Sequence, residues 1–356
     1  MDSSRPASSD HNIDPARRDF YARSGERNLA PLWEVLHTLI TAEPQSAVRP
    51  HLWHYAALRP FLLEACELIS AKEAERRVLI LENPAFKGQA KITQSLFSGL
   101  QIIMPGEVAP PHRHSQAALR FIIEGEGAYT AVDGERTTMR PGDFVVTPSW
   151  TWHDHGNTGT GPMVWLDGLD IHIVKLFEAS FREGAAAGPG EATTPAQPEG
   201  YSAARYGANL LPVEDDRGGP SSPVFSYPYA RTRAALEAMR QRAPWSRWHG
   251  LKMKYANPVT GDYAMPTIAT FIQLLPKSFK TAPYRSTSST VFVCVEGRGR
   301  TRIGEESFAW GPHDIFVAPS WVRHSHEAEE DAVLFSFSDQ GVQEKLGFFR
   351  EEKAEG

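Results

Sequence analysis

The stretch GEVAPPHRHSQAALRFIIEG (residues 106–125), followed by PGDFVVTPSWTWHDHGN (141–157), decides the fold of this chain. Its short apolar runs are separated by Gly, Pro and Asp, and Asp133-Gly134 divides AYTAV from ERTTM. An Asp-Gly pair between two such runs is a strong β-hairpin signal. Similar runs recur about every ten residues from Val78 onward, which predicts a β-sandwich or β-barrel.

The same pattern occurs a second time. Glu124-Gly125 aligns with Glu296-Gly297, and the PSW sequence at 148–150 aligns with PSW at 319–321. The sequence therefore predicts an all-β-dominated chain with two copies of one jelly-roll-like β-barrel domain.

The remaining segments surround these two copies. Apolar periodicity in LAPLWEVLHTLI and YAALRPFLLEACELISAKEAERR predicts helices, and Pro60 predicts a kink or break in the second. We divide the chain into a disordered tail (1–14), a helical segment (15–77), the first barrel (78–181), a linker with a helix (182–249), the second barrel (250–340) and a C-terminal tail (341–356).

The composition excludes several functional classes. The 356 residues carry 37 Lys and Arg against 43 Asp and Glu, a net charge of −6, so we expect neither a nucleic-acid nor a membrane partner. Cys66 and Cys294 are too few for a disulfide scaffold. The polar N-terminal residues contain no apolar leader, which favours a cytoplasmic protein.

Three histidines are the candidate metal ligands. His112 and His114 are two residues apart, so on a strand both side chains lie on one face. His153 belongs to a later strand that could return beside the first, and imidazoles suit first-row metal ions. A single His-x-His is more often structural, but the spacings from Gly106 to Gly125 and from Gly142 to Asn157 resemble the two cupin motifs.

Two positions depart from those motifs. Ala118 stands where the first motif usually has a Glu ligand, and Trp150 stands where the second usually has Gly. Three neutral ligands leave the 2+ charge uncompensated and three coordination positions open. Such a centre suits a chelating dianionic substrate and O₂, as in a non-haem Fe(II) ring-cleaving dioxygenase.

Most of the chain resembles the gentisate 1,2-dioxygenases, a family of bicupin iron enzymes. The resemblance extends from the barrel motifs to PHLWHYAALRPFL (50–62), SGLQIIMPGE (98–107) and KYANPVTGDYAMPT (254–267). It implies one Fe(II) per chain, bound by the three histidines of the first cupin, and O₂-dependent cleavage of gentisate to maleylpyruvate. It also implies a homotetramer. Close relatives in this group cleave salicylate or 1-hydroxy-2-naphthoate instead of gentisate.

The resemblance assigns further site residues. Arg120, six residues after His114, is expected to pair with the substrate carboxylate, although it could instead point to solvent. His155 is expected to exchange a proton with the substrate, and Asp167 to bind a site histidine or the distal hydroxyl; a structural role remains open for both. The expected substrate contacts are Gln101, Phe97 and either Arg76 or Arg77.

The second copy lacks most of these groups. Tyr284 and Ser286 replace the paired histidines and Phe292 replaces Arg120, while His324 and His326 persist. We interpret this copy as a degenerate cupin that stabilises or oligomerises the protein. The alternatives are a non-redox Zn or Mn cupin, which usually retains the Glu ligand, and a non-catalytic storage or ligand-binding bicupin.

Overall fold

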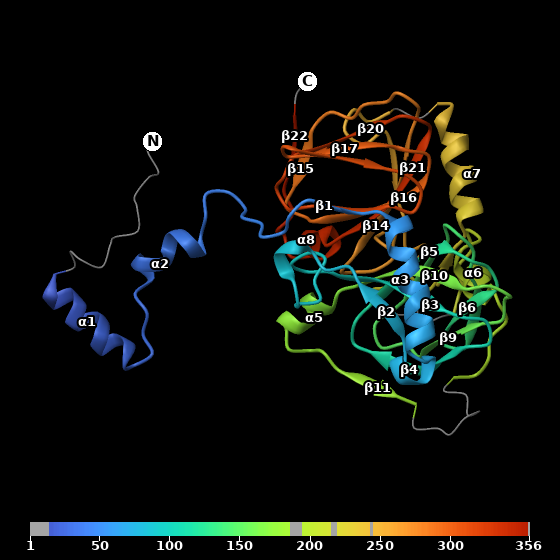
Figure 1. Cartoon of the computed structure of the whole chain (residues 1–356), viewed down its shortest axis with the longest axis horizontal. Helices are drawn as coiled ribbons and strands as arrows, with labels where there is room; N and C mark the ends of the chain where they lie inside the picture. Colours follow the sequence, from blue (N-terminus) through green and yellow to red (C-terminus); the bar gives the residue numbers. More distant parts are fainter. Residues whose placement is uncertain (1–13, 186–193, 215–218, 243–244, 355–356) are drawn as a thin grey trace. The chain divides into compact units, whose positions relative to one another are not determined.

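The computed structural model describes residues 14–185, 194–214, 219–242 and 245–354, in two units that divide after Gln45 (Figure 1). The first unit contains α1 (Pro15–Gly25) and α2 (Leu32–Leu39), and none of its described residues is buried. The disordered tail expected at 1–14 lies outside the described residues except for Asp14, which caps α1.

The first barrel consists of two sheets in one half of the second unit. One sheet has the order β12-β8-β5-β10-β3-β2 and the other β11-β4-β9-β6-β7. Their strands are β2 (Arg77–Ile80), β3 (Phe97–Ile103), β4 (Val108–His114), β5 (Ala118–Glu124), β6 (Ala128–Val132), β7 (Glu135–Thr138), β8 (Phe144–Thr147), β9 (His153–Asn157), β10 (Met163–Leu169), β11 (Arg182–Gly184) and β12 (Ser226–Tyr227).

The second barrel repeats this arrangement. Its sheets have the orders β1-β19-β16-β21-β14-β13 and β18-β17-β20-β15-β22. Their strands are β1 (His51–Trp53), β13 (Leu251–Lys254), β14 (Ala269–Leu275), β15 (Tyr284–Ser286), β16 (Thr290–Glu296), β17 (Gly299–Ile303), β18 (Glu306–Trp310), β19 (Ile315–Ala318), β20 (His324–Ala328), β21 (Ala332–Ser338) and β22 (Glu351–Lys353). Two β-barrels in an all-β-dominated chain confirm the fold expected from the sequence.

Helices accompany both barrels. They are α3 (Tyr55–Leu68), α4 (Ala71–Ala74), a 3₁₀ turn at Pro84–Phe86, α5 (Ile171–Leu176), α6 (Tyr201–Tyr206), α7 (Tyr229–Arg240) and α8 (Gln340–Lys345). The helix α3 continues through Pro60, so the break that this proline allows does not occur. No helix among the described residues is long and apolar enough to cross a membrane.

The two barrels exchange equivalent strand–helix units. Strand β1, which precedes α3, pairs with β19 of the second barrel, and β12, which precedes α7, pairs with β8 of the first. The backbone N–H of Tyr55 donates to Asp314 at 2.9 Å, and that of Tyr229 donates to Asp143 at 2.8 Å. The repeat therefore includes the helices, and each helix is capped by the barrel that its preceding strand joins.

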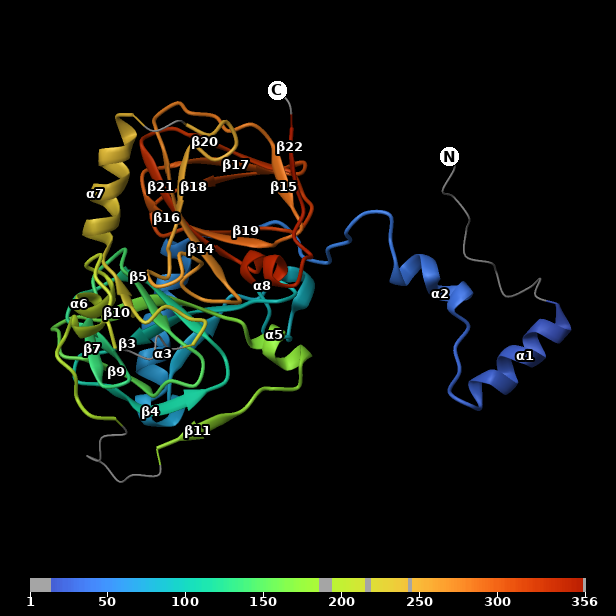
Figure 2. The same cartoon turned by 180° about the vertical axis from the view of Figure 1, so that it is seen from behind.

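The barrels pack on one another through a shared apolar core (Figure 2). Phe121 of β5 stacks on Phe335 of β21 with ring centroids 4.1 Å apart. Each barrel also has an interior apolar cluster, around Trp165 in the first and around Phe292 in the second. Interior residues alternate with interface residues along each strand, so the strands that form this shared core also line the barrel interiors.

Candidate metal centre and substrate pocket

Strands β4 and β9 bring the three candidate ligands together. His112 lies directly opposite His153 in the antiparallel register, and His114 follows two residues later on the same face. The ring centroids are 4.0 Å apart for His112 and His153, and 4.8 Å apart for His114 and His153. One nitrogen of each ring lies within 4.8 Å of the others, and this is the one such metal-ligand group among the described residues.

Backbone carbonyls fix two of these imidazoles. His114 Nδ1 lies 2.9 Å from the carbonyl oxygen of Gln116, and His153 Nδ1 lies 3.0 Å from that of Thr151. Because a carbonyl oxygen only accepts, each Nδ1 carries the proton and each Nε2 offers a lone pair. His153 is 2% exposed and its Nε2 has no hydrogen-bond partner. Such an unpartnered buried lone pair is what a metal ion would fill.

The environment keeps these imidazoles neutral. Burial, followed by the nearby arginines, lowers the pKa of His112 to about 2, and burial lowers that of His114 to about 4. Burial also holds the pKa of His153 well below its usual value. Neutral imidazole is the form that coordinates a metal, so metal binding need not displace a proton from these rings at neutral pH.

Arg76 contacts the metal-ligand group. Its guanidinium donates to Nδ1 of His112 at 2.6 Å and to the carbonyl of Pro110 at 3.2 Å. Burial, and then the charge of Arg120, lowers the pKa of Arg76 to about 10. Two arginines therefore place positive charge beside three neutral histidines, which favours an anionic ligand.

Arg120 lies inside the barrel and does not face solvent. It is 4% exposed, its Nη1 donates to the hydroxyl of Thr147, and its Nε lies 3.6 Å from Asp167 Oδ1. Asp167 is opposite Arg120 in the register of β10 and β5, and it accepts a hydrogen bond from Trp165 Nε1 at 3.0 Å. The structure thus directs Asp167 to Arg120 and Trp165 rather than to a histidine. Burial raises the pKa of Asp167 to about 6 against the attraction of Arg120.

His155 is fully buried, and its ring centroid lies 5.4 Å from that of Trp165. Its Nδ1 is 3.0 Å from Thr130 Oγ1, and its Nε2 has no hydrogen-bond partner. The Thr130 hydroxyl lies 3.2 Å from the sulfur of Met139, which can only accept. If Thr130 donates to that sulfur, His155 Nδ1 must donate to Thr130, which leaves Nε2 as an acceptor. This tautomer suits a group that takes a hydrogen bond or a proton from a ligand.

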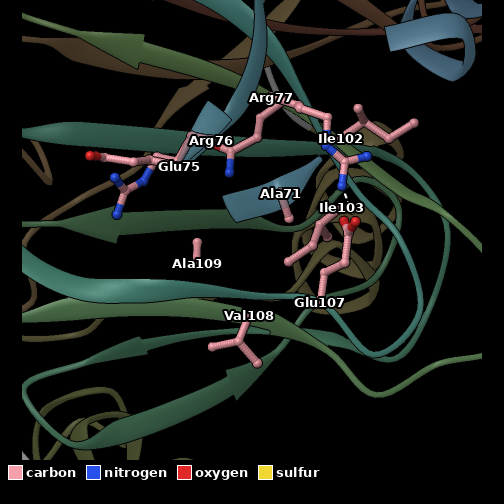
Figure 3. Close-up of a pocket in the computed structure, with 10 residues that line it drawn as sticks. Ala71, Glu75, Arg76, Arg77, Ile102, Ile103, Glu107, Val108 and Ala109 are labelled. Carbon is pink, nitrogen blue, oxygen red and sulfur yellow. Dashed lines mark hydrogen bonds and ion pairs between the residues drawn. The ribbon is translucent and has the colours of Figure 1, made fainter. Parts of the chain in front are cut away.

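The other residues expected to contact the substrate lie in different places. Gln101 is buried on β3 opposite Trp165, and Phe97 begins the same strand on the same face. Arg77 forms an ion pair with Glu107, and both line a small pocket to which Arg76 also contributes (Figure 3). Arg76 in addition contacts His112, whereas Arg77 has no such contact among the described residues. The structure therefore brings Arg76, and not Arg77, to the metal-ligand group.

The surroundings of Trp150 account for this departure from the second cupin motif. It has φ +63°, and its counterpart Trp321 has φ +62°, a left-handed conformation that favours glycine. The Arg113 guanidinium lies 4.6 Å from the Trp150 ring centroid, and the Phe181 ring is 4.2 Å away on centroids. Stacking by these side chains stabilises a conformation that the backbone alone disfavours.

Sequence reasoning missed several residues of the site. Thr130, Thr147 and Trp165 bind the side chains of His155, Arg120 and Asp167, respectively, and the sulfur of Met139 lies next to the Thr130 hydroxyl. None of these four residues has a metal-ligand or catalytic spacing. The internal repeat contains one usable signal, because Thr301 stands at the position of Thr130 and lies 2.8 Å from His326 Nδ1.

Comparison with known proteins agrees with this geometry. The family model described as "Cupin domain" matches residues 99–171. Gentisate 1,2 dioxygenase 1 of Aquipseudomonas alcaligenes is 58% identical over 337 residues, which are 95% of this chain and 96% of that protein. The chain belongs to the gentisate 1,2-dioxygenase family.

Two further relatives are named for other substrates. The 5-aminosalicylate 1,2-dioxygenase of a Comamonas species is 36% identical over 91% of this chain and 87% of that protein. The crystal structure of salicylate 1,2-dioxygenase from Pseudoaminobacter salicylatoxidans, in its adduct with gentisate, superposes with a TM-score of 0.90. It is 33% identical and covers 99% of this chain and 98% of that one. The resemblance inferred from the motifs is thereby confirmed.

Proposed function

We propose that this protein cleaves the ring of gentisate with O₂, between the carboxyl-bearing carbon and the neighbouring hydroxyl-bearing carbon, to give maleylpyruvate. Both oxygen atoms enter the product, so the reaction balances without an external reductant. The observation that carries the proposal is the group of three neutral histidines beside the buried Arg120. The 58% identity to a gentisate 1,2-dioxygenase over nearly the whole chain supports the choice of substrate.

We propose Fe(II) as the metal, one ion per chain, held by His112, His114 and His153. The unpartnered Nε2 of His153 and the absence of a carboxylate from this group fit a first-row ion with several open positions. When bound, the ion supplies the redox chemistry that activates O₂ toward the chelated substrate. Arg76 must release Nδ1 of His112, or the ring must turn, because a ring cannot offer both nitrogens as acceptors while neutral.

The protein itself supplies binding and orientation. In this proposal Arg120 pairs with the substrate carboxylate and is held in place by Asp167 and Thr147. His155 presents Nε2 to a substrate hydroxyl and takes its proton. Gln101, Phe97 and Arg76 line the substrate position, with Phe97 facing the ring, whereas Arg77 stabilises the surrounding strands through Glu107.

Salicylate is the second candidate substrate, with 1-hydroxy-2-naphthoate behind it. Both share the carboxylate and adjacent hydroxyl of gentisate, which are the groups that Arg120 and a metal would bind. A salicylate 1,2-dioxygenase that also forms an adduct with gentisate shows that one family member accommodates both ligands. The different-class alternative is a bicupin that binds an aromatic acid without turnover.

One experiment separates these possibilities. The protein is purified without oxygen, loaded with Fe(II), and mixed with air-saturated buffer containing gentisate, salicylate or 1-hydroxy-2-naphthoate. We expect one O₂ consumed per gentisate, with the absorbance of maleylpyruvate appearing at the same rate. Binding of gentisate without oxygen uptake by the iron-loaded protein would contradict the proposal.

We further propose that the protein acts in the cytoplasm as a homotetramer. The apolar side chains of α2, among them Leu32, Trp33 and Leu36, are exposed, and no residue in the described segment 14–45 is buried. Exposed apolar side chains of this kind support self-association. Sedimentation velocity at several protein concentrations tests the tetramer.

A further inference from the structure

The second barrel contains a lysine without an acidic partner. Lys252 lies on β13, and its ammonium is 4.2 Å from the centroid of the Phe271 ring. Among the described residues it makes no hydrogen bond and no ion pair. The acidic group that acts on it at longer range is Glu351, which already accepts from Tyr284 Oη at 3.0 Å and from Lys353 Nζ at 2.7 Å.

Unpartnered polar groups lie on the same face of this barrel. Gln273 is 1% exposed and its Nε2 has no partner, and Ser336 is 0% exposed and its Oγ has none. Gln273 lies opposite both Lys252 and Leu334, and Ser336 lies opposite Phe271 two residues further along. Leu334 belongs to the interior apolar cluster of the second barrel, so this face points into the barrel.

Comparison of the two barrels shows why the lysine is unpaired. In the first barrel Arg120 lies opposite Asp167; at the equivalent positions of the second, Phe292 lies opposite Ser336. Val78 lies opposite Gln101 in the first barrel, whereas Lys252 lies opposite Gln273 in the second. The second barrel therefore has a glutamine at the position of Gln101, a cation on a different strand, and no carboxylate at the position of Asp167.

We propose that the interior of the second barrel binds a small carboxylate monoanion between Lys252, Gln273 and Ser336. Lys252 is partly buried, and a cation that loses part of its hydration is stabilised by a counter-charge. An amide N–H and a hydroxyl complete the set of donors for two carboxylate oxygens. A single lysine matches one negative charge. The neighbouring His249 and His324 are kept neutral by burial, so they add no second charge that would favour a phosphate dianion.

The site is separate from the dioxygenase centre. It uses β13, β14 and β21, whereas the histidine group uses β4 and β9 of the other barrel. The proposal therefore does not depend on which substrate the first barrel takes, and substitutions at Lys252 or Ser336 leave turnover of gentisate as the internal control.

Thermal unfolding of the full-length, metal-loaded protein tests the site with acetate as the probe. Chloride is replaced by acetate at constant pH and ionic strength, up to about 200 mM, which saturates a site with millimolar Kd. We expect the melting temperature of the wild type to rise by about 2 °C or more. Lys252→Met should lose this rise, and Lys254→Met, on the exposed end of the same strand, should keep it.

Two further variants make the test decisive. Arg120→Met should keep the acetate response, since that arginine belongs to the first barrel. Ser336→Asp places a carboxylate at the position that Asp167 occupies in the first barrel, so it should raise the melting temperature in chloride and abolish the acetate response. The proposal is overturned if the wild type shows no rise, if Lys252→Met retains it, or if Ser336→Asp is destabilised and still responds to acetate.

Discussion

Arg120 and Asp167 form a buried ion pair across neighbouring strands, with Nε 3.6 Å from Oδ1. The Nε–H of Arg120 nevertheless has no hydrogen-bond partner, because 3.6 Å is too long for one. Arg120 is thus oriented by Asp167 and Thr147 and retains a donor that they do not use. A ligand carboxylate in this barrel would complete the arginine's contacts.

Removing the Arg120 guanidinium should impair catalysis without affecting the metal. Breaking one half of a buried charge pair costs about 2–5 kcal/mol, so Arg120→Ala should lower kcat/KM for gentisate about 30-fold or more. Arg120→Lys should recover little, because an ammonium cannot make a two-pronged contact. Steady-state kinetics and metal content are measured together; normal turnover by Arg120→Ala would mean that another cation binds the carboxylate, with Arg76 next in line.

Metal retention should depend on the first barrel alone. His114→Ala leaves two imidazoles and should lose most of the bound iron after dialysis, as should His153→Ala. His324→Ala, at the position equivalent to His153 in the second barrel, is the matched control and should leave the iron content at one per chain. Elemental analysis measures the iron content of all three variants and of the wild type. Two irons per wild-type chain would show that the second barrel also binds metal.

Thr130 should act on turnover through His155. Thr130→Val keeps the shape but removes the hydroxyl that orients Nδ1, so we expect kcat to fall about tenfold or more with little change in KM. Thr130→Ser should restore most of the activity. Imidazole ¹⁵N shifts of the zinc-loaded protein should report Nδ1–H for His155 in the wild type and a mixture of tautomers in Thr130→Val. An unchanged tautomer together with an unchanged kcat would mean that Thr130 does not orient His155 for catalysis.

The exchanged helices should contribute equally to stability. Asp314→Ala removes the acceptor for the buried N–H of Tyr55, and Asp143→Ala does the same for Tyr229. Leaving such a donor unsatisfied costs about 1–3 kcal/mol, so urea unfolding should show similar losses for both variants. A loss for only one of them would mean that the two junctions are not energetically equivalent.

The pH dependence of the protein's stability should depend on the protonation of Lys252. Burial lowers the pKa of Lys252 from 10.5 to about 8, and His249, His324, His326 and Glu351 are the titratable groups coupled to it. Between about 8 and 10.5 the folded chain releases a proton that the unfolded chain still holds, so this residue makes stability rise with pH. In chloride, Lys252→Met should therefore be more stable than the wild type at pH 7, and the difference should close above about pH 8. A constant difference across that range would contradict the buried charge.

The sequence by itself determined the features that depend on local spacing. Period-2 runs with Asp133-Gly134 indicate strands and hairpins whatever their partners, and two residues between His112 and His114 place both on one face of any strand. The repeat of PSW and of Glu-Gly showed that the second barrel exists and that its histidine pair is gone. These features follow from the geometry of one strand and need no tertiary information.

Tertiary structure decided everything that depends on which strands lie side by side. Arg76 and Arg77 are adjacent in sequence, yet one contacts His112 and the other Glu107, because Arg76 lies in the bend after α4 and Arg77 begins β2. The pairing of Arg120 with Asp167 and of His155 with Thr130 depends on antiparallel register between distant strands. So does the exchange of β1 and β12 between the barrels, since a strand of two or three residues has no period of its own and is ordered only by the edge that it joins.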